Sequence, residues 1–158
     1  MIEYIHNPSG PGLEDIKQLF REYVKWLALD LSFQDFEKEL ETLPGKYAPP
    51  DGAVILAADD GAPAGCVALR KIDNDTCEMK RLFVRESYRG SGIGRELVKR
   101  IIRESVTRGY KKMLLDTLES MKSARKLYED AGFKVRDPYY HNPLEGAVFM
   151  ELDLTQPA

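Results

Sequence analysis

Apolar residues in the first third of the chain recur with a spacing that predicts a strand followed by two helices. The strand covers about Ile2–Ile5, and between Leu13 and Leu27 apolar positions return every three or four residues, as on one helix face. A second, short helix is predicted after Ser32, whose hydroxyl suits an N-cap. Its apolar positions are Phe33, Phe36 and Leu40. Proline and glycine between residues 43 and 52 then predict a loop.

An antiparallel meander of three strands is predicted next. Residues 53–58, 64–72 and 76–84 are apolar segments separated by turns that contain Asp, Asn, Gly or Pro. With the second turn at Asp73-Asn74, residue 72 would face residue 75 and residue 77 would face residue 70. Cys66 is then out of register with Cys77 for a disulfide, so both are expected to be buried, reduced thiols.

The second half of the chain alternates helices and strands. Residues 97–106 predict an amphipathic helix and 113–115 a short buried strand, where parallel pairing begins. Residues 120–131 predict another helix, and 133–135 and 147–154 predict two final strands. The order βααβββαβαββ describes a mixed α/β sheet.

Size and composition add a few limits. A chain of 158 residues with 43% hydrophobic content is expected to form one domain, residues 1–158. It has no apolar run long enough for a membrane span and no signal-peptide pattern at its start, so a soluble, cytoplasmic protein without membrane contacts is expected. Two cysteines and two scattered histidines are too few for a metal site.

The charge is unevenly distributed. The chain as a whole carries −3, whereas residues 80–103 contain eight basic and two acidic side chains, a local +6 that leaves −9 elsewhere. The acidic total argues against a nucleic-acid-binding module, and the basic segment suggests that it meets an anion. The remaining negative charge favours a cationic acceptor, although mild acidity is also ordinary for soluble proteins.

A glycine-rich turn lies inside that basic segment, between a predicted strand and a predicted helix. In Arg89-Gly90-Ser91-Gly92-Ile93-Gly94-Arg95, glycines allow several backbone N–H groups to point at one spot beside a helix N-terminus, which favours phosphate. The dinucleotide and Walker A patterns are both absent. A tight turn without a ligand is the alternative interpretation of the glycines alone.

The same segment resembles the GNAT acetyltransferases. Their signature [QR]-x-x-G-x-[GA] is matched by residues 89–94, their fourth strand by Glu78–Val84, and their A-x-x-L-Y-x-x-x-G-F helix by Ala124–Phe133. The resemblance implies the acyl-CoA N-acyltransferase fold, with a mixed, mostly antiparallel sheet that is splayed at strands 4 and 5 and flanked by helices. It also implies acetyl-coenzyme A as co-substrate.

The resemblance implies which residues hold the coenzyme. Backbone groups would bind the pantetheine arm, and the turn would bind the pyrophosphate. The first set is Leu82, Phe83 and Val84, and the second is Arg89, Gly90, Ser91, Gly92, Ile93, Gly94 and Arg95. Independently, the apolar alternation of this strand slips across Lys80-Arg81, which predicts a bulge.

Two catalytic residues are implied in the same way. Tyr128 would protonate the leaving thiolate, and Glu78, eleven positions before Arg89, would be the general base. The alternatives are a core tyrosine and a surface glutamate paired with Lys80 or Arg81. Many members carry an asparagine where this chain has Met121, so the contacts of that asparagine are not carried over.

The acceptor side is expected between the first helices and the late strands. Its candidate residues are Gln34, Tyr47, Tyr139, Tyr140 and Asn142, the last three in a proline-bounded loop. A rigid surface loop is the alternative for these three.

The expected function is therefore transfer of an acetyl group from acetyl-coenzyme A to a primary amine of a small molecule or protein. A non-catalytic acyl-coenzyme A sensor that binds a protein partner is the alternative. A homodimer is possible, as in many relatives.

Overall fold

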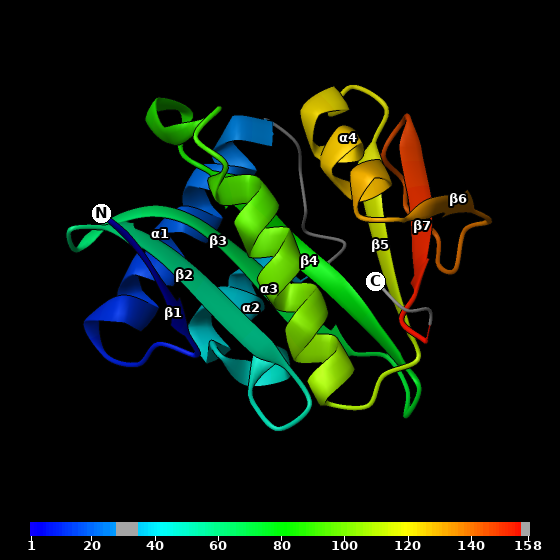
Figure 1. Cartoon of the computed structure of the whole chain (residues 1–158), viewed down its shortest axis with the longest axis horizontal. Coiled ribbons are helices and arrows are strands. Elements are labelled where there is room, and N and C mark those ends of the chain that lie inside the picture. Colours follow the sequence, from blue (N-terminus) through cyan, green and yellow to red (C-terminus); the bar gives the residue numbers. More distant parts are fainter. Residues whose placement is uncertain (28–34, 156–158) are drawn as a thin grey trace.

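The computed structural model describes residues 1–27 and 35–155, and its strands form one seven-stranded sheet in the order β1-β2-β3-β4-β5-β7-β6 (Figure 1). The strands are β1 (Ile2–His6), β2 (Ala53–Asp59), β3 (Ala62–Lys71), β4 (Thr76–Val84), β5 (Lys112–Leu118), β6 (Lys134–Arg136) and β7 (Ala147–Asp153). The helices are α1 (Pro11–Leu27), α2 (Phe36–Thr42), α3 (Ile93–Thr107) and α4 (Lys122–Asp130), with short 3₁₀ turns η2 (Gly45–Tyr47) and η3 (Glu86–Tyr88). The predicted element order is confirmed.

Strand direction follows the predicted mixed pattern. Every neighbouring pair is antiparallel except β4 and β5, which are parallel. These two strands pair only from Thr76 opposite Lys112 to Glu78 opposite Leu114. Beyond Glu78 they diverge, so the predicted splay at strands 4 and 5 is confirmed.

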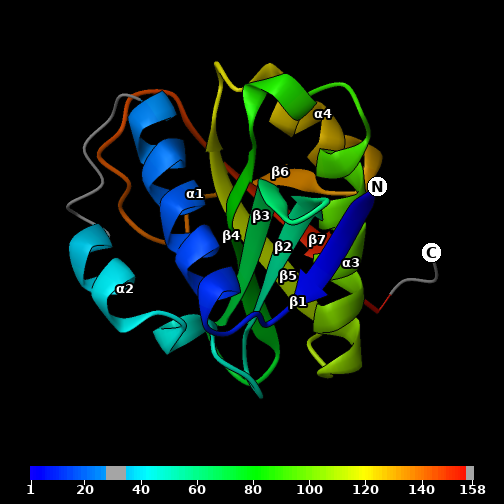
Figure 2. The same cartoon turned by 90° about the vertical axis from the view of Figure 1, so that its left-hand side faces the viewer.

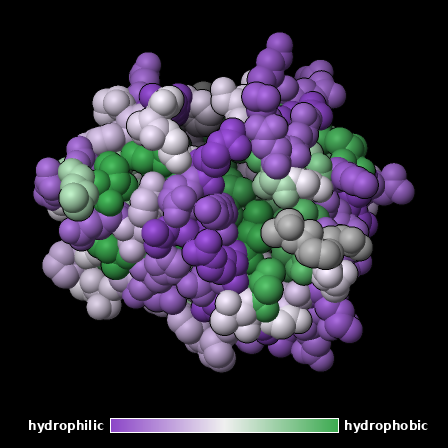
Figure 3. Space-filling view, viewed as in Figure 1, coloured by the Kyte–Doolittle hydropathy of each residue, from purple (hydrophilic) through white to green (hydrophobic). Residues whose placement is uncertain are grey.

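Helices cover both faces of the sheet, with α1 and α2 on one side and α3 and α4 on the other (Figure 2). In β2, Ile55 packs into the cluster beneath α3, whereas its neighbours Val54 and Leu56 pack beneath α1. A strand buried on both faces reads as a continuous apolar run, which is why residues 53–58 show no alternation. On its outer side α3 carries hydrophilic side chains, with apolar surface visible beside it (Figure 3).

A bulge interrupts β4 where the sequence predicts one. Ala68 lies opposite Lys80 and Cys66 opposite Phe83, so β4 holds one more residue than β3 between these pairs. Arg81 takes the left-handed conformation, with φ of 62°. This residue bends the strand and shifts its register with β3, and pairing resumes at Phe83, in the part that faces β5 across the splay.

The register predicted for the β3–β4 hairpin is wrong by one residue. Cys77 lies opposite Lys71 rather than residue 70, and Arg70 faces Glu78. The loop has three residues rather than two, because the Asp73 carboxylate accepts a hydrogen bond from the Asp75 amide at 2.9 Å and closes a wider turn. Both cysteines are nevertheless buried and free, as expected.

Other differences lie at element boundaries. The helix predicted from Ser32 is observed from Phe36, and Ser32 and Phe33 lie outside the described residues. The helix α4 begins at Lys122 rather than at residue 120, and β6 is shifted by one residue to Lys134–Arg136. No helix in the described ranges has the length and apolar character needed to cross a membrane.

Candidate active site

A large crevice opens between the end of β4, the turn before α3, and α4. Its volume is about 900 Å³, which is large enough for a sizeable organic ligand. The lining contains nine of the ten predicted coenzyme residues, all but Ser91, together with residues of α4. From β4 and the turn these are Leu82, Phe83, Val84, Arg89, Gly90, Gly92, Ile93, Gly94 and Arg95, and from α4 Ala124 and Leu127.

The turn before α3 leaves an open cradle of backbone groups. Gly90 and Gly92 have φ of 81° and 90°, and a Cβ built on either would meet no atom within 4 Å. Gly92 is the N-cap of α3 and offers no side-chain cap, so within the described ranges no side chain caps the first N–H groups of the helix. The hydroxyl of Ser91 donates back to the Tyr88 carbonyl and holds the turn. Such a turn fits phosphate oxygens.

The end of β4 completes the crevice. Because pairing with β5 stops at Glu78, the backbone of Leu82–Val84 faces the splay without a β5 ladder. An extended ligand can lie there and hydrogen-bond as an added strand would. The crevice therefore fits a pantetheine arm that ends in phosphates, as the sequence predicts.

Only part of the local positive charge points at the crevice. Of the eight basic residues between 80 and 103, only Arg89 and Arg95 line it. Ion pairs occupy Arg81, Arg85, Arg95 and Arg100, whose respective partners are Glu39, Glu22, Asp130 and Glu96. The guanidinium of Arg89 lies 4.7 Å from the ring centre of Trp26, which also lines the crevice. The charge of this segment thus serves folding as well as anion binding.

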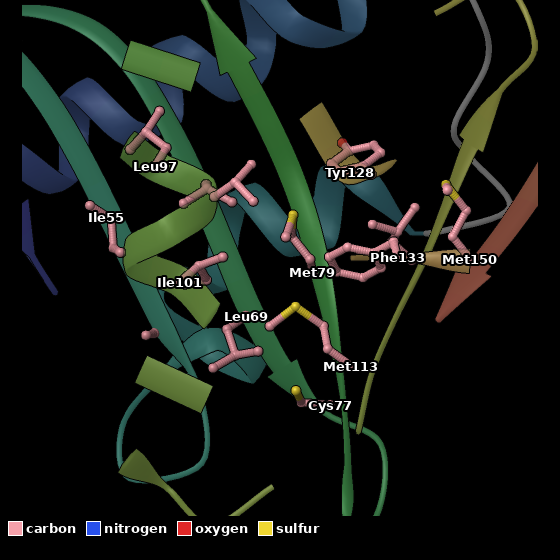
Figure 4. Packing of buried hydrophobic residues seen from close by; sticks show 14 of the residues in the cluster. Ile55, Leu69, Cys77, Met79, Leu97, Ile101, Met113, Tyr128, Phe133 and Met150 are labelled. Carbon is pink, nitrogen blue, oxygen red and sulfur yellow. The ribbon is translucent and has the colours of Figure 1, made fainter. Parts of the chain in front are cut away.

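A smaller cavity of about 50 Å³ adjoins the crevice and shares Leu27, Leu82, Leu118 and Met121 with it. Tyr128 of α4 lines this cavity and is 6% exposed, at the edge of the core cluster in Figure 4. Burial raises the pKa of its hydroxyl well above the ordinary value of 10. Tyr128 is therefore protonated at neutral pH, the state that a proton donor needs.

Glu78 lies deeper and does not line either space. It is 1% exposed; its Oε1 accepts from Arg70 Nε at 2.6 Å, and its Oε2 accepts from the hydroxyl of Tyr139. Burial by itself would raise its pKa, but the charges of Lys80 and Arg70 and these two hydrogen bonds lower it. Glu78 is thus an ionised carboxylate with both oxygens engaged.

The predicted acceptor residues are separated by the fold. Tyr47 is 0% exposed and donates to Glu39 Oε1 at 2.9 Å, so it lies inside the core rather than on a pocket wall. Asn142 lines the small cavity, whereas Tyr139 and Tyr140 pack on Phe149 and send their hydroxyls to carboxylates. Gln34 lies outside the described residues.

Five further polar residues line the small cavity and are not among the predicted site residues, namely Tyr23, Lys80, Arg81, Asp116 and Thr117. They lie in or directly beside segments that predict a helix and two strands, and the family resemblance implies a role for none of them. Asp116 is the one available signal, because it directly follows the apolar run 113–115 of β5 and a carboxylate beside a buried run needs a hydrogen-bonding partner or a functional role. Among the described residues no group of metal-ligating side chains gathers.

Comparison with known structures shows the class of protein. A GNAT-family acetyltransferase from Staphylococcus aureus has a TM-score of 0.81 at 22% identity, covering 98% of this chain and 100% of that one. PaiA N-acetyltransferase from Thermoplasma acidophilum, solved with coenzyme A, has a TM-score of 0.76 at 22% identity, covering 97% and 99%. The fold is that of the acetyltransferases.

Sequence comparison gives the family. Residues 13–133 match the Acetyltransferase (GNAT) family. An uncharacterised N-acetyltransferase of Schizosaccharomyces pombe is 43% identical over 146 residues, covering 91% of this chain and 90% of that protein. The chain belongs to the GNAT family and is an acetyl-coenzyme A-dependent acetyltransferase.

Proposed function

We propose that the protein transfers the acetyl group of acetyl-coenzyme A directly to a primary amine of a small molecule or protein. The observation that carries this proposal is the junction of the two spaces: the crevice that fits the coenzyme adjoins a small cavity lined by Tyr128. An acceptor nitrogen in that cavity would lie beside the thioester. Holding the two reactants together supplies much of the rate.

The chain contributes binding, orientation and a proton. Backbone groups of Leu82–Val84 hold the pantetheine arm, and the turn containing Gly90 and Gly92 holds the pyrophosphate. Tyr128 donates its proton to the departing thiolate. The family resemblance implies Glu78 as the base that receives the amine proton, but both of its oxygens already accept hydrogen bonds.

The test is a calorimetric titration with acetyl-coenzyme A, followed by a free-thiol assay with a panel of primary amines. Cys66 and Cys77 are buried, and burial raises the pKa of Cys77 to about 12, so the folded protein adds little thiol background. Binding with amine-dependent thiol release supports the proposal. Binding without release for any amine would favour the sensor, and no binding would contradict both.

A further inference from the structure

The small cavity beside the crevice contains a carboxylate that the function has not yet used. Asp116 lies on β5 two residues beyond Leu114, the last residue paired with β4, so it stands where the two strands diverge. It is half-buried and lines the cavity together with Tyr128. Tyr23 lines the same cavity; burial raises the pKa of the Tyr23 and Tyr128 hydroxyls, and the charge of Asp116 adds to that rise.

The loop between β6 and β7 fixes this carboxylate. The hydroxyl of Tyr140 donates to Asp116 Oδ2, and Asn142 Nδ2 donates to the same oxygen at 2.8 Å. The Tyr140 ring in turn packs edge-on against Phe149 of β7. Two donors on one oxygen orient the carboxylate while leaving Oδ1 available to a ligand, as far as the described residues go.

Glu78 has the opposite arrangement. Both of its oxygens accept hydrogen bonds, one from Arg70 and one from Tyr139, and it does not line the cavity. Tyr139 packs against Tyr140 with ring centres 5.4 Å apart. Glu78 therefore holds Tyr139 in place, and the adjacent Tyr140 orients Asp116.

We infer that Asp116 binds the ammonium group of the acceptor and takes its first proton, and that Glu78 is a positioning residue behind it. This inference rests on the proposed transfer to an amine. A cavity of about 50 Å³ has room for an ammonium group and little more, so the rest of the acceptor lies outside it.

The acetyl transfer balances in protons and electron pairs with Asp116 and Tyr128 as the proton-transfer groups. The ammonium group gives one proton to Asp116, which passes it to solvent, and the nitrogen lone pair forms the C–N bond as the C–S bond breaks. The departing sulfur receives a proton from Tyr128. The second proton of the nitrogen restores Tyr128, so the products are an amide, a thiol and one released proton.

Other charged groups face the same cavity. Lys80 comes from β4 and is 9% exposed; burial lowers its pKa, although the charges of Glu78 and Asp116 act in the opposite direction. Arg81 is held by Glu39. Lys80, Arg81 and Asp116 thus line the same cavity, and among the described residues Asp116 is its one carboxylate.

The experiment compares Asp116→Asn with Glu78→Gln, using ethylamine as the probe amine. Asp116→Asn should lower kcat/KM for ethylamine by about 100-fold or more, the usual contribution of a proton-transfer group. Its Kd for acetyl-coenzyme A should stay within about twofold of the wild-type value, because the residue lies outside the crevice. Glu78→Gln should lose less and keep the pH profile of the wild type.

A binding readout separates a direct role from a structural one. In the coenzyme A complex, ethylamine should shift the side-chain amide signal of Asn142 in the wild type and in Tyr140→Phe, but not in Asp116→Asn. Tyr140→Phe is the matched control, since it removes one donor to Oδ2 and keeps the carboxylate.

The outcomes are distinct. The inference is overturned if Asp116→Asn keeps the wild-type kcat/KM, or if ethylamine still shifts the Asn142 signal in that variant as it does in the wild type. A larger loss of kcat/KM in Glu78→Gln than in Asp116→Asn would return the role of base to Glu78. If the wild type binds acetyl-coenzyme A but releases no thiol with ethylamine or any other amine, the proposed function fails, and the inference fails with it.

Discussion

Burial decides what Tyr128 can do. Its ring packs edge-on against Phe133 at 5.8 Å between centres, so the residue is part of the core and also lines the small cavity. The two interpretations that the sequence left open, a core tyrosine and a proton donor, are therefore compatible. The same burial that stabilises the ring keeps the hydroxyl protonated.

Replacing Tyr128 with phenylalanine keeps the ring and removes the proton. We expect Tyr128→Phe to lower kcat by about 10²- to 10⁴-fold, the usual range for a general acid. Its Kd for acetyl-coenzyme A and its melting temperature should change little. Thiol-release kinetics measure kcat, titration calorimetry measures Kd, and thermal unfolding gives the melting temperature. A wild-type kcat in this variant would show that Tyr128 is not the acid.

At the scale of elements, the start of α3 depends on backbone conformation rather than on side chains. Gly92 opens the helix at positive φ. A Cβ on Gly94, the second residue of α3, would lie 3.1 Å from the side chain of Leu127 in α4. The first glycine shapes the phosphate cradle, and the second lets the two helices that flank the crevice approach each other.

The chain offers a matched pair for testing the cradle. Gly92 and Gly109 have φ of 90° and 87°, and a Cβ at either meets nothing within 4 Å. Alanine at each site should destabilise the protein by about 1–2 kcal/mol through its positive φ. Only Gly92→Ala should also weaken acetyl-coenzyme A binding, because Gly109 lies at the other end of α3. Equal affinities in the two variants would contradict the cradle.

The strand β4 illustrates which features of an element can be predicted. Its bulge was visible because the apolar alternation slips at Lys80-Arg81, and the period of a strand is strict. The register of the β3–β4 hairpin could not be predicted in this way, because it depends on whether Asp73 closes a two- or a three-residue loop. A one-residue error there leaves the bulge and the splay in place.

At the scale of the whole molecule, one ion pair joins segments that are distant in sequence. Arg81, at the bulge, donates two hydrogen bonds of 2.9 Å to Glu39 of α2, and Tyr47 donates a third. Burial alone would raise the pKa of Glu39, but Arg81 outweighs it and lowers the pKa. The pair holds α2 against the bulge that shapes the active site.

This pair predicts a pH dependence of stability. A lowered folded-state pKa means that the stabilisation is complete above the ordinary value of 4.5 and is lost as the pH falls through the folded-state pKa. Glu39→Gln should cost about 3–5 kcal/mol at pH 7, since it leaves a buried arginine without its counter-ion. The difference from the wild type should shrink below pH 4.5.

Denaturant titrations at several pH values measure this difference. Glu14→Gln is the control, because Glu14 pairs with Lys17 on the surface with 70% of its side chain exposed. It should change stability by less than about 1 kcal/mol at any pH. A Glu39→Gln variant as stable as the control at pH 7 would remove the ion pair as a structural lock.

The element order, the mixed sheet, the bulge and the glycine-rich turn before α3 could all be predicted from the sequence. These depend on local periods, on glycine conformation and on contiguous motifs, all of which are written within short stretches of chain. The cavity beside Tyr128 was decided only by tertiary structure. Asp116, Lys80 and Tyr23 come from three different elements, and the burial that sets the protonation of Tyr128 and ties Glu78 to Arg70 exists only once those elements pack.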